Sequence, residues 1–221
     1  IYRSGEYSSV LEIRNPWQGA QGVSDELFIS CNGEQPPAGF NGNVVAAPLK
    51  NVVCMSSTYV AFIDKLGETN SITGVSGARY ISNDSIVKWH SEGKVRDVGY
   101  DTNINYELIA NLRPDIVLIY GVAGENTSVT NKLKELGIPV TYIADYLEEE
   151  PLGKAEWLVA FGEMYGKREF AEAHFARISE TYGMWRGRAE GLPQKPSVML
   201  NAPYRDVWFV PGDRSYMVKL I

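Results

Sequence analysis

Five short apolar runs between residues 51 and 146 constrain the fold of this chain more than any other feature. Each run ends in a polar, glycine-rich or aromatic loop, and segments with helical periodicity lie between most of them. Strands that alternate with helices predict a parallel sheet with helices on its faces. Ligands of such sheets bind beyond the carboxyl ends of the strands, so the loops after the strands are the ones to read for function. The predicted strands are residues 51–55, 71–75, 95–98, 115–120 and 138–143.

The helices expected between these strands have recognisable start and stop signals. The first follows the capping hydroxyls of residues 56–58 and stops before Gly67, and another stops before Pro114. Hydroxyl side chains are typical of helix starts and glycine of helix ends, while the residue before a proline disfavours helix. The predicted helices end at residues 66, 91, 112 and 136.

The alternation breaks at residue 152. Residues 152–165 and 168–188 have helical periodicity with few strong breakers between them, and 191–193 stops them. New strands are expected at 197–201 and 207–210, followed by the opening of a helix.

We therefore predict an α/β protein with a parallel-sheet, Rossmann-like N-terminal lobe, a long connecting helix and the start of a second α/β lobe. The expected boundaries are 1–48 for an N-terminal β appendage, 49–150 for the first lobe, 151–190 for the interlobe helix and 195–221 for the second lobe.

The appendage has strand character at residues 8–14 and 26–31, and its simplest role is to cover a sheet edge. The chain begins at Ile1 rather than Met and stops within the apolar helical pattern of residues 215–221. We expect a fragment of a longer protein from which a targeting segment or another N-terminal part has been removed.

Composition excludes several classes of protein. The net charge of −6 argues against a nucleic-acid partner, because nucleic-acid binders present a basic face. No apolar run approaches the ~20 residues that span a membrane. Cys31 and Cys54 lack spaced histidines, so no metal site is expected, and a disulfide between them is not required.

Tyrosine, arginine and hydroxyl side chains recur in the loops after the strands. A guanidinium group binds carboxylate, phosphate or catecholate-type oxygens, and a phenol offers an aromatic face and one hydrogen bond. These residue types suit a large, flat or anionic ligand. Hydroxyls at a helix N-terminus could also hold an anion. The ligand-binding candidates from this lobe are Ser56, Ser57, Arg79, Tyr80, Tyr100, Asp101 and Tyr120. The last strand-end loop also holds Asp145 and Tyr146, which are not among these candidates.

Catalytic signals are weak. His90 lies in a polar helix, His174 lies within the long helical segment, and neither has a nucleophile at a motif position. Ser56 is not part of a G-x-S-x-G turn. Neither G-x-G-x-x-G nor a P-loop occurs, so dinucleotide and nucleoside-triphosphate sites lack their fingerprints. We predict no enzyme activity and no cofactor.

A series of short motifs, in a fixed order, resembles one family. They are VCMSS at 53–57, LG at 66–67, ITGV at 72–75, VGY at 98–100 running into NYE at 105–107, LRPDIVL at 112–118, LKELGIP at 133–139 and GDRS at 212–215. Together they resemble the substrate-binding proteins of bacterial ABC importers for iron-siderophores, haem and cobalamin. The resemblance covers about residues 49–221, and the appendage before it resembles versions found in Bacteroidetes-type bacteria.

This resemblance implies two α/β lobes joined by a rigid helix, with the ligand between them. It implies docking of Glu107 onto the membrane permease and an extracytoplasmic location, periplasmic or at the cell surface, through a lipid anchor that this chain lacks. The ligand would be an iron chelate, haem or a corrinoid. On the second lobe, the expected ligand-binding residues are Asn201, Tyr204, Arg205 and Trp208.

Two other functions stay open at this point. An α/β enzyme acting on a small polar substrate would need a nucleophile or general base in the same cleft. A module that reports to a signalling or adhesion partner could use residues 1–49 as its contact surface. Neither alternative has a motif in its favour.

Overall fold

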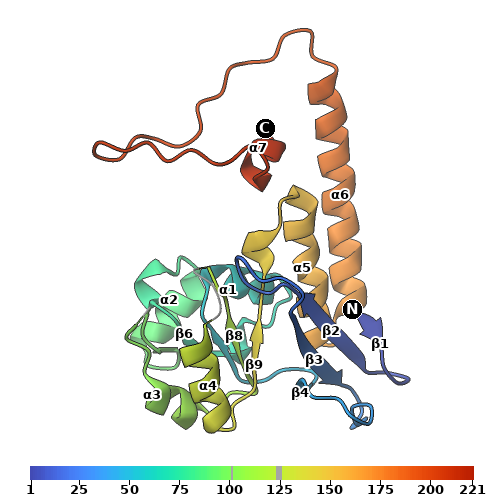
Figure 1. Ribbon diagram of the computed structural model, residues 1–221, viewed down its shortest axis with the longest axis vertical. Helices are drawn as coiled ribbons and strands as arrows, with labels where there is room; N and C mark the ends of the chain where they lie inside the picture. The colour runs from blue at the N-terminus through green and yellow to red at the C-terminus, as the bar shows by residue number, and fades with distance from the viewer. Residues whose placement is uncertain (101, 123–125) are drawn as a thin grey trace.

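The computed structural model describes residues 1–100, 102–122 and 126–221 (Figure 1). Its centre is a five-stranded sheet in the order β7-β6-β5-β8-β9, with every neighbouring pair parallel. The chain runs outward from β5 through β6 to β7, then crosses back to β8 on the other side of β5. This order is that of a Rossmann-like half, so the α/β prediction is confirmed. The strands are β5 (Val52–Cys54), β6 (Ile72–Val75), β7 (Arg96–Asp97), β8 (Ile116–Ile119) and β9 (Val140–Tyr142).

Helices cover both faces of this sheet, and the side chains of β5 show why. Val52 and Cys54 point into one core and Val53 into the other, as the two-residue period of a strand requires. Burial on both faces accounts for the unbroken apolar runs of the sequence. The first core includes residues of α1 (Ser57–Lys65) and α2 (Asp84–Ser91), and the second includes residues of α3 (Tyr106–Leu112) and α4 (Thr127–Glu135).

The Tyr59 side chain joins α1 to the sheet. It is fully buried, and its hydroxyl lies 3.1 Å from the carbonyl oxygens of both Ile119 and Ile143, which share its hydrogen. These carbonyls lie at the carboxyl ends of β8 and β9. The first turn of α1 is therefore fixed over the edge of the sheet where ligands of this fold class bind.

The N-terminal appendage is a second sheet in the order β1-β2-β3-β4. Its β2 and β3 form an antiparallel ladder, while β4 pairs with β3 in parallel. The sequence predicted β2 and β3 but missed the short β1 and β4, which lack a clear alternating pattern. The strands are β1 (Tyr2–Arg3), β2 (Ser9–Arg14), β3 (Ser24–Ser30) and β4 (Asn43–Ala46).

The appendage sheet lies against the β9 edge of the main sheet. The carboxylate of Asp25 accepts hydrogen bonds from the Thr141 hydroxyl at 2.7 Å and from the Tyr142 backbone N–H at 2.9 Å. The Asn43 side-chain amide donates to the Val140 carbonyl at 2.7 Å. Side chains of the appendage thus take the place of a sixth strand beside β9. Burial raises the pKa of Asp25, and these two hydrogen bonds offset only part of that effect.

The long helical segment consists of two helices that pack side by side, α5 (Pro151–Met164) and α6 (Arg168–Glu190). Gly166, with a φ of 63°, occupies the left-handed region at the corner between them. Phe161 and Met164 of α5 are fully buried in the first core. The Lys167 ammonium donates to the Leu66 carbonyl at 2.8 Å, which ties the corner to the end of α1. The far half of α6 extends away from the sheets (Figure 1).

The strands predicted at 197–201 and 207–210 are wrong. Only an isolated antiparallel bridge between Tyr204 and Val207 forms there, and most side chains of the segment are exposed. An apolar run becomes a strand only beside other strands, and none of the described residues supplies a neighbour for these two. The predicted opening of a helix is present as α7 (Tyr216–Leu220).

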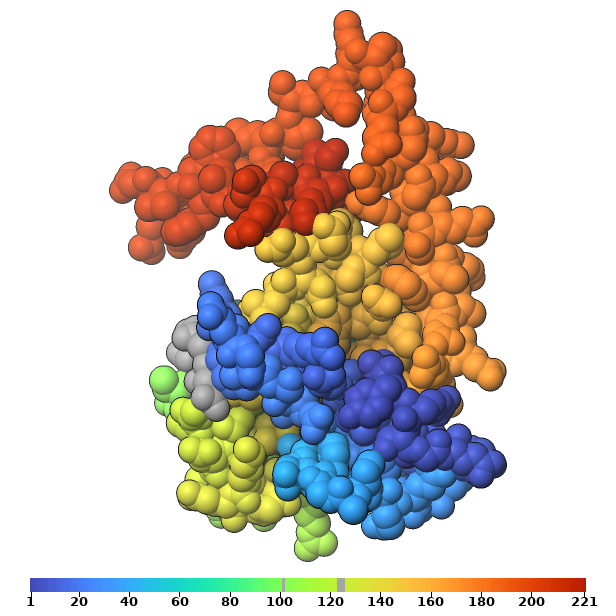
Figure 2. All heavy atoms as spheres, turned by 45° about the vertical axis from the view of Figure 1, so that its right-hand side comes forward, coloured from blue at the N-terminus to red at the C-terminus, as the bar shows by residue number. Residues whose placement is uncertain are grey.

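The short helix α7 of the C-terminal segment packs against α5 (Figure 2). The Lys219 ammonium lies 2.5 Å from a carboxylate oxygen of Glu150, just before α5. The Lys154 ammonium of α5 lies 4.6 Å from the centre of the Tyr216 ring. Within the described part of the chain, no helix is both long and apolar enough to cross a membrane. Cys31 and Cys54 are free thiols.

Substitution of Tyr59 by Phe tests the attachment of α1 to the sheet. Loss of the buried hydroxyl should lower the free energy of unfolding by about 1–2 kcal/mol, because two buried carbonyls lose their shared donor. Urea unfolding followed by circular dichroism measures the change. Tyr2→Phe, at a side chain that is 49% exposed, is the matched control and should leave stability unchanged. Equal effects of the two substitutions would contradict this role of Tyr59.

Substitution of Asp25 by Asn tests the buried carboxylate at the β9 edge. Because the pKa of Asp25 is raised in the folded state, this group stabilises the fold at pH values below its unfolded-state pKa of about 3.9. That stabilisation is lost as the pH rises through the folded-state pKa. Between pH 4 and pH 7, the wild type should therefore lose stability relative to Asp25→Asn in urea unfolding. Glu26→Gln, at the next position of β3, is the control and should follow the wild type. Parallel pH profiles for wild type and Asp25→Asn would contradict the burial effect.

Candidate functional site

An open pocket of about 390 Å³ lies at the carboxyl ends of the sheet strands. It is centred on the loop after β5, beside the point where the strand order reverses, which is where sheets of this kind bind ligands. Loops after β6, β7, β8 and β9 also contribute to it. The described lining residues are Met55, Ser56, Ser57, Thr58, Tyr59, Ser76, Tyr80, Ile81, Tyr100, Tyr120, Val122, Asp145, Tyr146 and Lys154.

The floor of the pocket is formed by the first turn of α1. Ser56 is the N-cap residue, and its side chain accepts a hydrogen bond from the Thr58 backbone N–H at 3.3 Å. The Ser56 and Thr58 hydroxyls lie 2.9 Å apart. The positive end of the helix dipole therefore faces the pocket through a set of short hydroxyl side chains.

One wall is a pair of tyrosines that face each other. The rings of Tyr80 and Tyr100 have centroids 5.3 Å apart at an angle of 53°. The Arg79 guanidinium donates to the Tyr80 hydroxyl at 2.7 Å and lies 4.6 Å from the centre of the Tyr80 ring. Arg79 itself does not line the pocket, so its contribution is to hold Tyr80.

A single carboxylate organises the two loops that carry this pair. Asp97, at the end of β7, accepts hydrogen bonds from the backbone N–H groups of Gly77, Ala78 and Gly99 at 3.1, 2.9 and 3.0 Å. Gly77 and Gly99 have φ values of 64° and 91°, which favour glycine. Sequence reasoning missed Asp97. The two flanking glycines at strand ends were the signal that a side chain could bind exposed backbone there.

The opposite wall is formed by the loops after β8 and β9. The Gln18 backbone N–H lies 3.2 Å from both the Tyr146 hydroxyl and the Gly121 carbonyl, so the appendage supports both loops. Burial raises the pKa of Tyr146. Tyr120 lines the pocket beside it.

A buried carboxylate, Asp145, lies at the end of this wall. Only 4% of the residue is exposed. Burial raises the pKa of Asp145, although the Lys154 charge and the Thr58 side chain act in the other direction. The Lys154 ammonium donates to the backbone carbonyl of Asp145 at 2.9 Å.

Five of the sequence-predicted residues line this pocket: Ser56, Ser57, Tyr80, Tyr100 and Tyr120. Asp101 lies outside the described residues. Thr58, Asp145 and Tyr146 also line the pocket, and they lie in loops after strands as the predicted residues do. Ser76 and Lys154 were missed, because a single serine and a helical lysine carry no pattern that distinguishes them.

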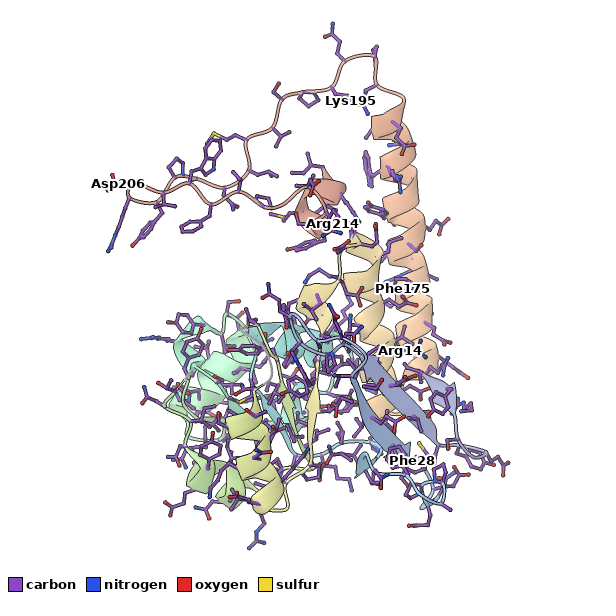
Figure 3. All side chains as sticks on the ribbon, in the orientation of Figure 1. Arg14, Phe28, Phe175, Lys195, Asp206 and Arg214 are labelled. Carbon is purple, nitrogen blue, oxygen red and sulfur yellow. The ribbon has the colours of Figure 1, made fainter. Side chains whose placement is uncertain are left out.

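The candidates on the C-terminal segment do not line this pocket. Tyr204, Arg205 and Trp208 lie near the end of the loop marked by Asp206 in Figure 3, and all three are exposed. Arg205 lies 5.3 Å from the centre of the Tyr204 ring, and the Trp208 indole N–H donates to the Leu200 carbonyl at 3.0 Å. These three residues therefore do not meet the first-lobe candidates in this structure.

Glu107 is exposed in the first turn of α3 and does not line the pocket. Asn105 caps that helix by accepting from the Leu108 backbone N–H at 2.9 Å, and its own N–H donates to the Val98 carbonyl. Glu107 is therefore fixed on the surface next to the end of β7, where a second macromolecule can reach it.

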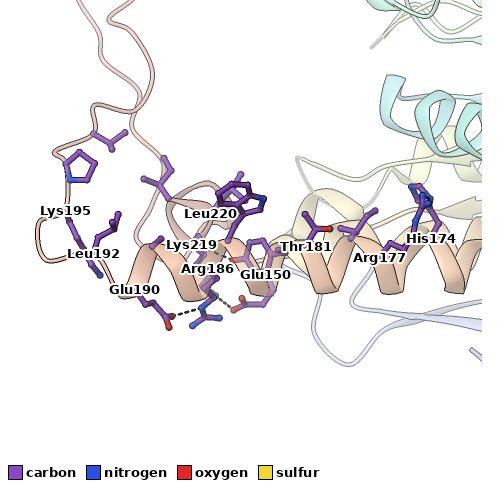
Figure 4. Close-up of a pocket in the computed structure, with 17 residues that line it drawn as sticks. Glu150, His174, Arg177, Thr181, Arg186, Glu190, Leu192, Lys195, Lys219 and Leu220 are labelled. Carbon is purple, nitrogen blue, oxygen red and sulfur yellow. Dashed lines mark hydrogen bonds and ion pairs between the residues drawn. The ribbon is translucent and has the colours of Figure 1, made fainter.

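A larger hollow of about 1530 Å³ lies between α6 and the C-terminal segment (Figure 4). Its wall includes Trp185 and Leu192, and the ion pair of Arg186 with Glu190 spans 2.9 Å at its rim. One side is an extended segment with almost no regular hydrogen bonding, so this hollow lacks the rigid frame of the strand-end pocket. The strand-end pocket is the better candidate site.

Neither histidine takes part in the strand-end pocket. The His90 Nδ1 atom lies 3.0 Å from the Val95 carbonyl, and His174 lies 2.9 Å from Arg177 on α6. Within residues 1–100, 102–122 and 126–221, no group of three His, Cys, Asp or Glu side chains is placed to hold a metal ion.

The chain is similar to two uncharacterized lipoproteins of Methanocaldococcus jannaschii. It is 32% identical to one over 197 residues, which cover 83% of this chain and 45% of the relative. It is 26% identical to the other over 211 residues, covering 91% of this chain and 53% of the relative. The chain spans about half the length of these relatives.

Solved structures share the fold at low sequence identity. A petrobactin-binding protein of Bacillus subtilis has a TM-score of 0.55 at 15% identity, over 84% of this chain and 55% of its own. A periplasmic binding protein of Veillonella parvula has a TM-score of 0.57 at 14% identity, over 86% and 57%. A periplasmic heme-binding protein of Pseudomonas aeruginosa has a TM-score of 0.50 at 19% identity, over 64% and 48%.

A family model described as periplasmic binding protein matches residues 52–221, from the first strand of the main sheet to the last residue. The match leaves out the appendage and covers more than half of the chain. The chain belongs to the periplasmic binding protein family.

Proposed function

We propose that this chain is part of an extracytoplasmic solute-binding protein that captures an iron-siderophore or related metal chelate and delivers it to an ABC importer. The observation that carries the proposal is the tyrosine-walled pocket at the strand ends, in a chain of this family. An extracytoplasmic location is supported by the lipoprotein relatives.

The pocket chemistry fits a large, partly aromatic or amphipathic ligand. Five tyrosines are among its described lining residues, and phenol rings supply apolar contact area together with a hydrogen-bonding hydroxyl. The small Ser and Thr side chains on the floor can accept or donate hydrogen bonds and leave room for a ligand. The names of three structural neighbours point the same way, since they refer to petrobactin, heme and Fe3+-hydroxamate transport.

The pocket is open, so the ligand needs a second wall. We propose that Tyr204, Arg205 and Trp208 contribute to that wall when the second lobe is assembled. The long interlobe helix would then set the distance between the lobes. Lys167 ties the corner of this segment to the first lobe, and the ion pair of Glu163 with Arg168, at 2.5 Å, joins α5 to α6 across the corner. We therefore expect small lobe movements on binding.

An enzyme in the same pocket has less support. The Ser56 hydroxyl contacts Thr58, and neither histidine is among the described lining residues, so no serine–histidine pair forms there. Family membership also favours binding over turnover. We infer that the site binds its ligand without changing it.

Ligand titration tests the proposed function. Calorimetry of the protein at its full natural length with ferric hydroxamates, heme and cobalamin should detect binding of at least one of them. Tyr100→Ala should weaken that binding about tenfold, because it removes one ring of the wall pair. Tyr7→Ala, on the exposed surface of the appendage, is the matched control and should bind like the wild type. Absence of binding to all three ligand types would overturn the proposal.

Substitution of Glu107 tests the proposed docking to the permease. Glu107→Gln should reduce ligand-dependent stimulation of the importer ATPase in proteoliposomes about tenfold, because the carboxylate would pair with a permease arginine. Ligand affinity should stay the same, since the residue lies outside the pocket. Glu135→Gln, at an exposed carboxylate of α4, is the control. Full stimulation by Glu107→Gln would remove this residue from the interface.

A further inference from the structure

A turn of the appendage lies behind the strand-end pocket. It occupies residues 17–20, in the connection between β2 and β3, and the Ala20 backbone N–H closes it by donating to the Trp17 carbonyl at 3.0 Å. Gly19, with a φ of 86°, stands at the third position, where a type II turn requires a positive φ. The N–H of the second residue, Gln18, takes no part in closing such a turn, so it can bind a group outside it.

This N–H group binds the opposite wall of the pocket, formed by the loops after β8 and β9. It donates to the Tyr146 hydroxyl and to the Gly121 carbonyl, and both nitrogen–oxygen distances are 3.2 Å. Tyr146 follows β9 and lines the pocket. Gly121 follows β8 and lies between Tyr120 and Val122, which also line the pocket. One backbone group of the appendage therefore joins the two loops of this wall.

Further contacts fix the turn in its place. The Trp17 and Tyr142 ring centroids are 5.1 Å apart, and Trp17 packs against the second core. The Tyr142 hydroxyl accepts from the Asn126 backbone N–H, at the start of α4, at 3.0 Å. Beyond the turn, Asp25 of β3 accepts from the Thr141 hydroxyl and the Tyr142 N–H. The turn is thus held to β9, on the side of the sheet where the wall begins.

These contacts exceed what a cover for the sheet edge requires. Asp25 and Asn43 already occupy the β9 edge, and neither contacts the strand-end loops. Neither Trp17 nor Gln18 is among the described lining residues, so the turn can act on a ligand only through the wall. The family model begins at residue 52, so family membership assigns no role to the appendage.

We propose that the turn at residues 17–20 is a positioning element of the solute site, which raises ligand affinity by holding Tyr120 and Tyr146 in their binding geometry. The inference rests on the proposed function and extends the site to a part of the chain outside the family match. A wall that is already held does not have to be ordered when the ligand binds, and the entropy of that ordering would otherwise weaken binding. Loss of the Gln18 N–H should therefore lower affinity although no ligand contact is removed.

Proline at position 18 tests this role, because it removes the N–H group and suits the second position of the turn. Calorimetry uses the protein at its full natural length, with ferrioxamine B, heme and cyanocobalamin as probes. Gln18→Pro should bind each probe that the wild type binds about tenfold more weakly, since two acceptors in the wall lose their donor.

The matched control is proline at the same position of a second turn in the appendage. The Phe40 backbone N–H closes that turn on the Pro37 carbonyl at 3.0 Å, and Gly39 at its third position has a φ of 82°. Ala38 is exposed, and its N–H makes no hydrogen bond within the described part of the chain. Ala38→Pro should bind the probes like the wild type.

Hydrogen exchange gives a readout that a merely structural role would not change. Coupling between two sites is reciprocal, so a ligand that gains affinity from the held wall must also stabilise the contact between wall and turn. Saturation with a bound probe should slow exchange of the Gln18 amide about tenfold in the wild type. The Glu34 amide, which donates to the Cys31 carbonyl elsewhere in the appendage, should keep its rate. This measurement decides the question if Gln18→Pro does not fold.

The outcomes separate this inference from the proposed function. Wild-type affinity in folded Gln18→Pro, or an unchanged exchange rate of the Gln18 amide in the ligand-bound wild type, would overturn the positioning role while the binding function stands. Failure of all three probes to bind the wild type would overturn the proposed function and this inference with it.

Discussion

The central strand β5 is the constraint on which the rest of the structure depends. Its three residues are fully buried, and they belong to two cores at once because successive side chains point to opposite faces. Helices must therefore cover both faces, and the chain must leave β5 in one direction and return on its other side. That return places the loop after β5 next to the loop after β8. The pocket is a product of this strand order, since its floor and one wall come from those two loops.

Much of this arrangement could be predicted from the sequence. The run at 115–120 and its shorter companions gave the right strand positions, because burial on both faces removes polar residues from such strands. The end of the helix at Ser91 was predicted, since Gly93 follows it. The strand-end rule then placed Tyr80, Tyr100 and Tyr120 at one pocket. Local sequence patterns were sufficient to predict the strands, the helices and the loops that end at the pocket.

The rest depended on contacts between distant residues. The runs at 197–201 and 207–210 have strand composition, but composition cannot supply the neighbouring strands that a ladder needs. The role of Asp97 depends on three backbone N–H groups from two loops, which no local window contains. Arg79 has the residue type of an anion receptor, yet its neighbour Tyr80 takes its hydrogen bond. Side-chain identity alone does not say which groups the protein has already used.

The placement of the appendage affects how this protein behaves among copies of itself. An edge strand with free N–H and C=O groups invites pairing with a strand of another molecule. At β9 such pairing is blocked, because the Asp25 carboxylate accepts from the Tyr142 N–H and the Asn43 amide donates to the Val140 carbonyl. At the other margin, β7 is two residues long and carries the exposed Arg96. Among the described residues, neither border of the central sheet offers a long unpaired strand, which protects this chain against strand-to-strand aggregation at high local concentration.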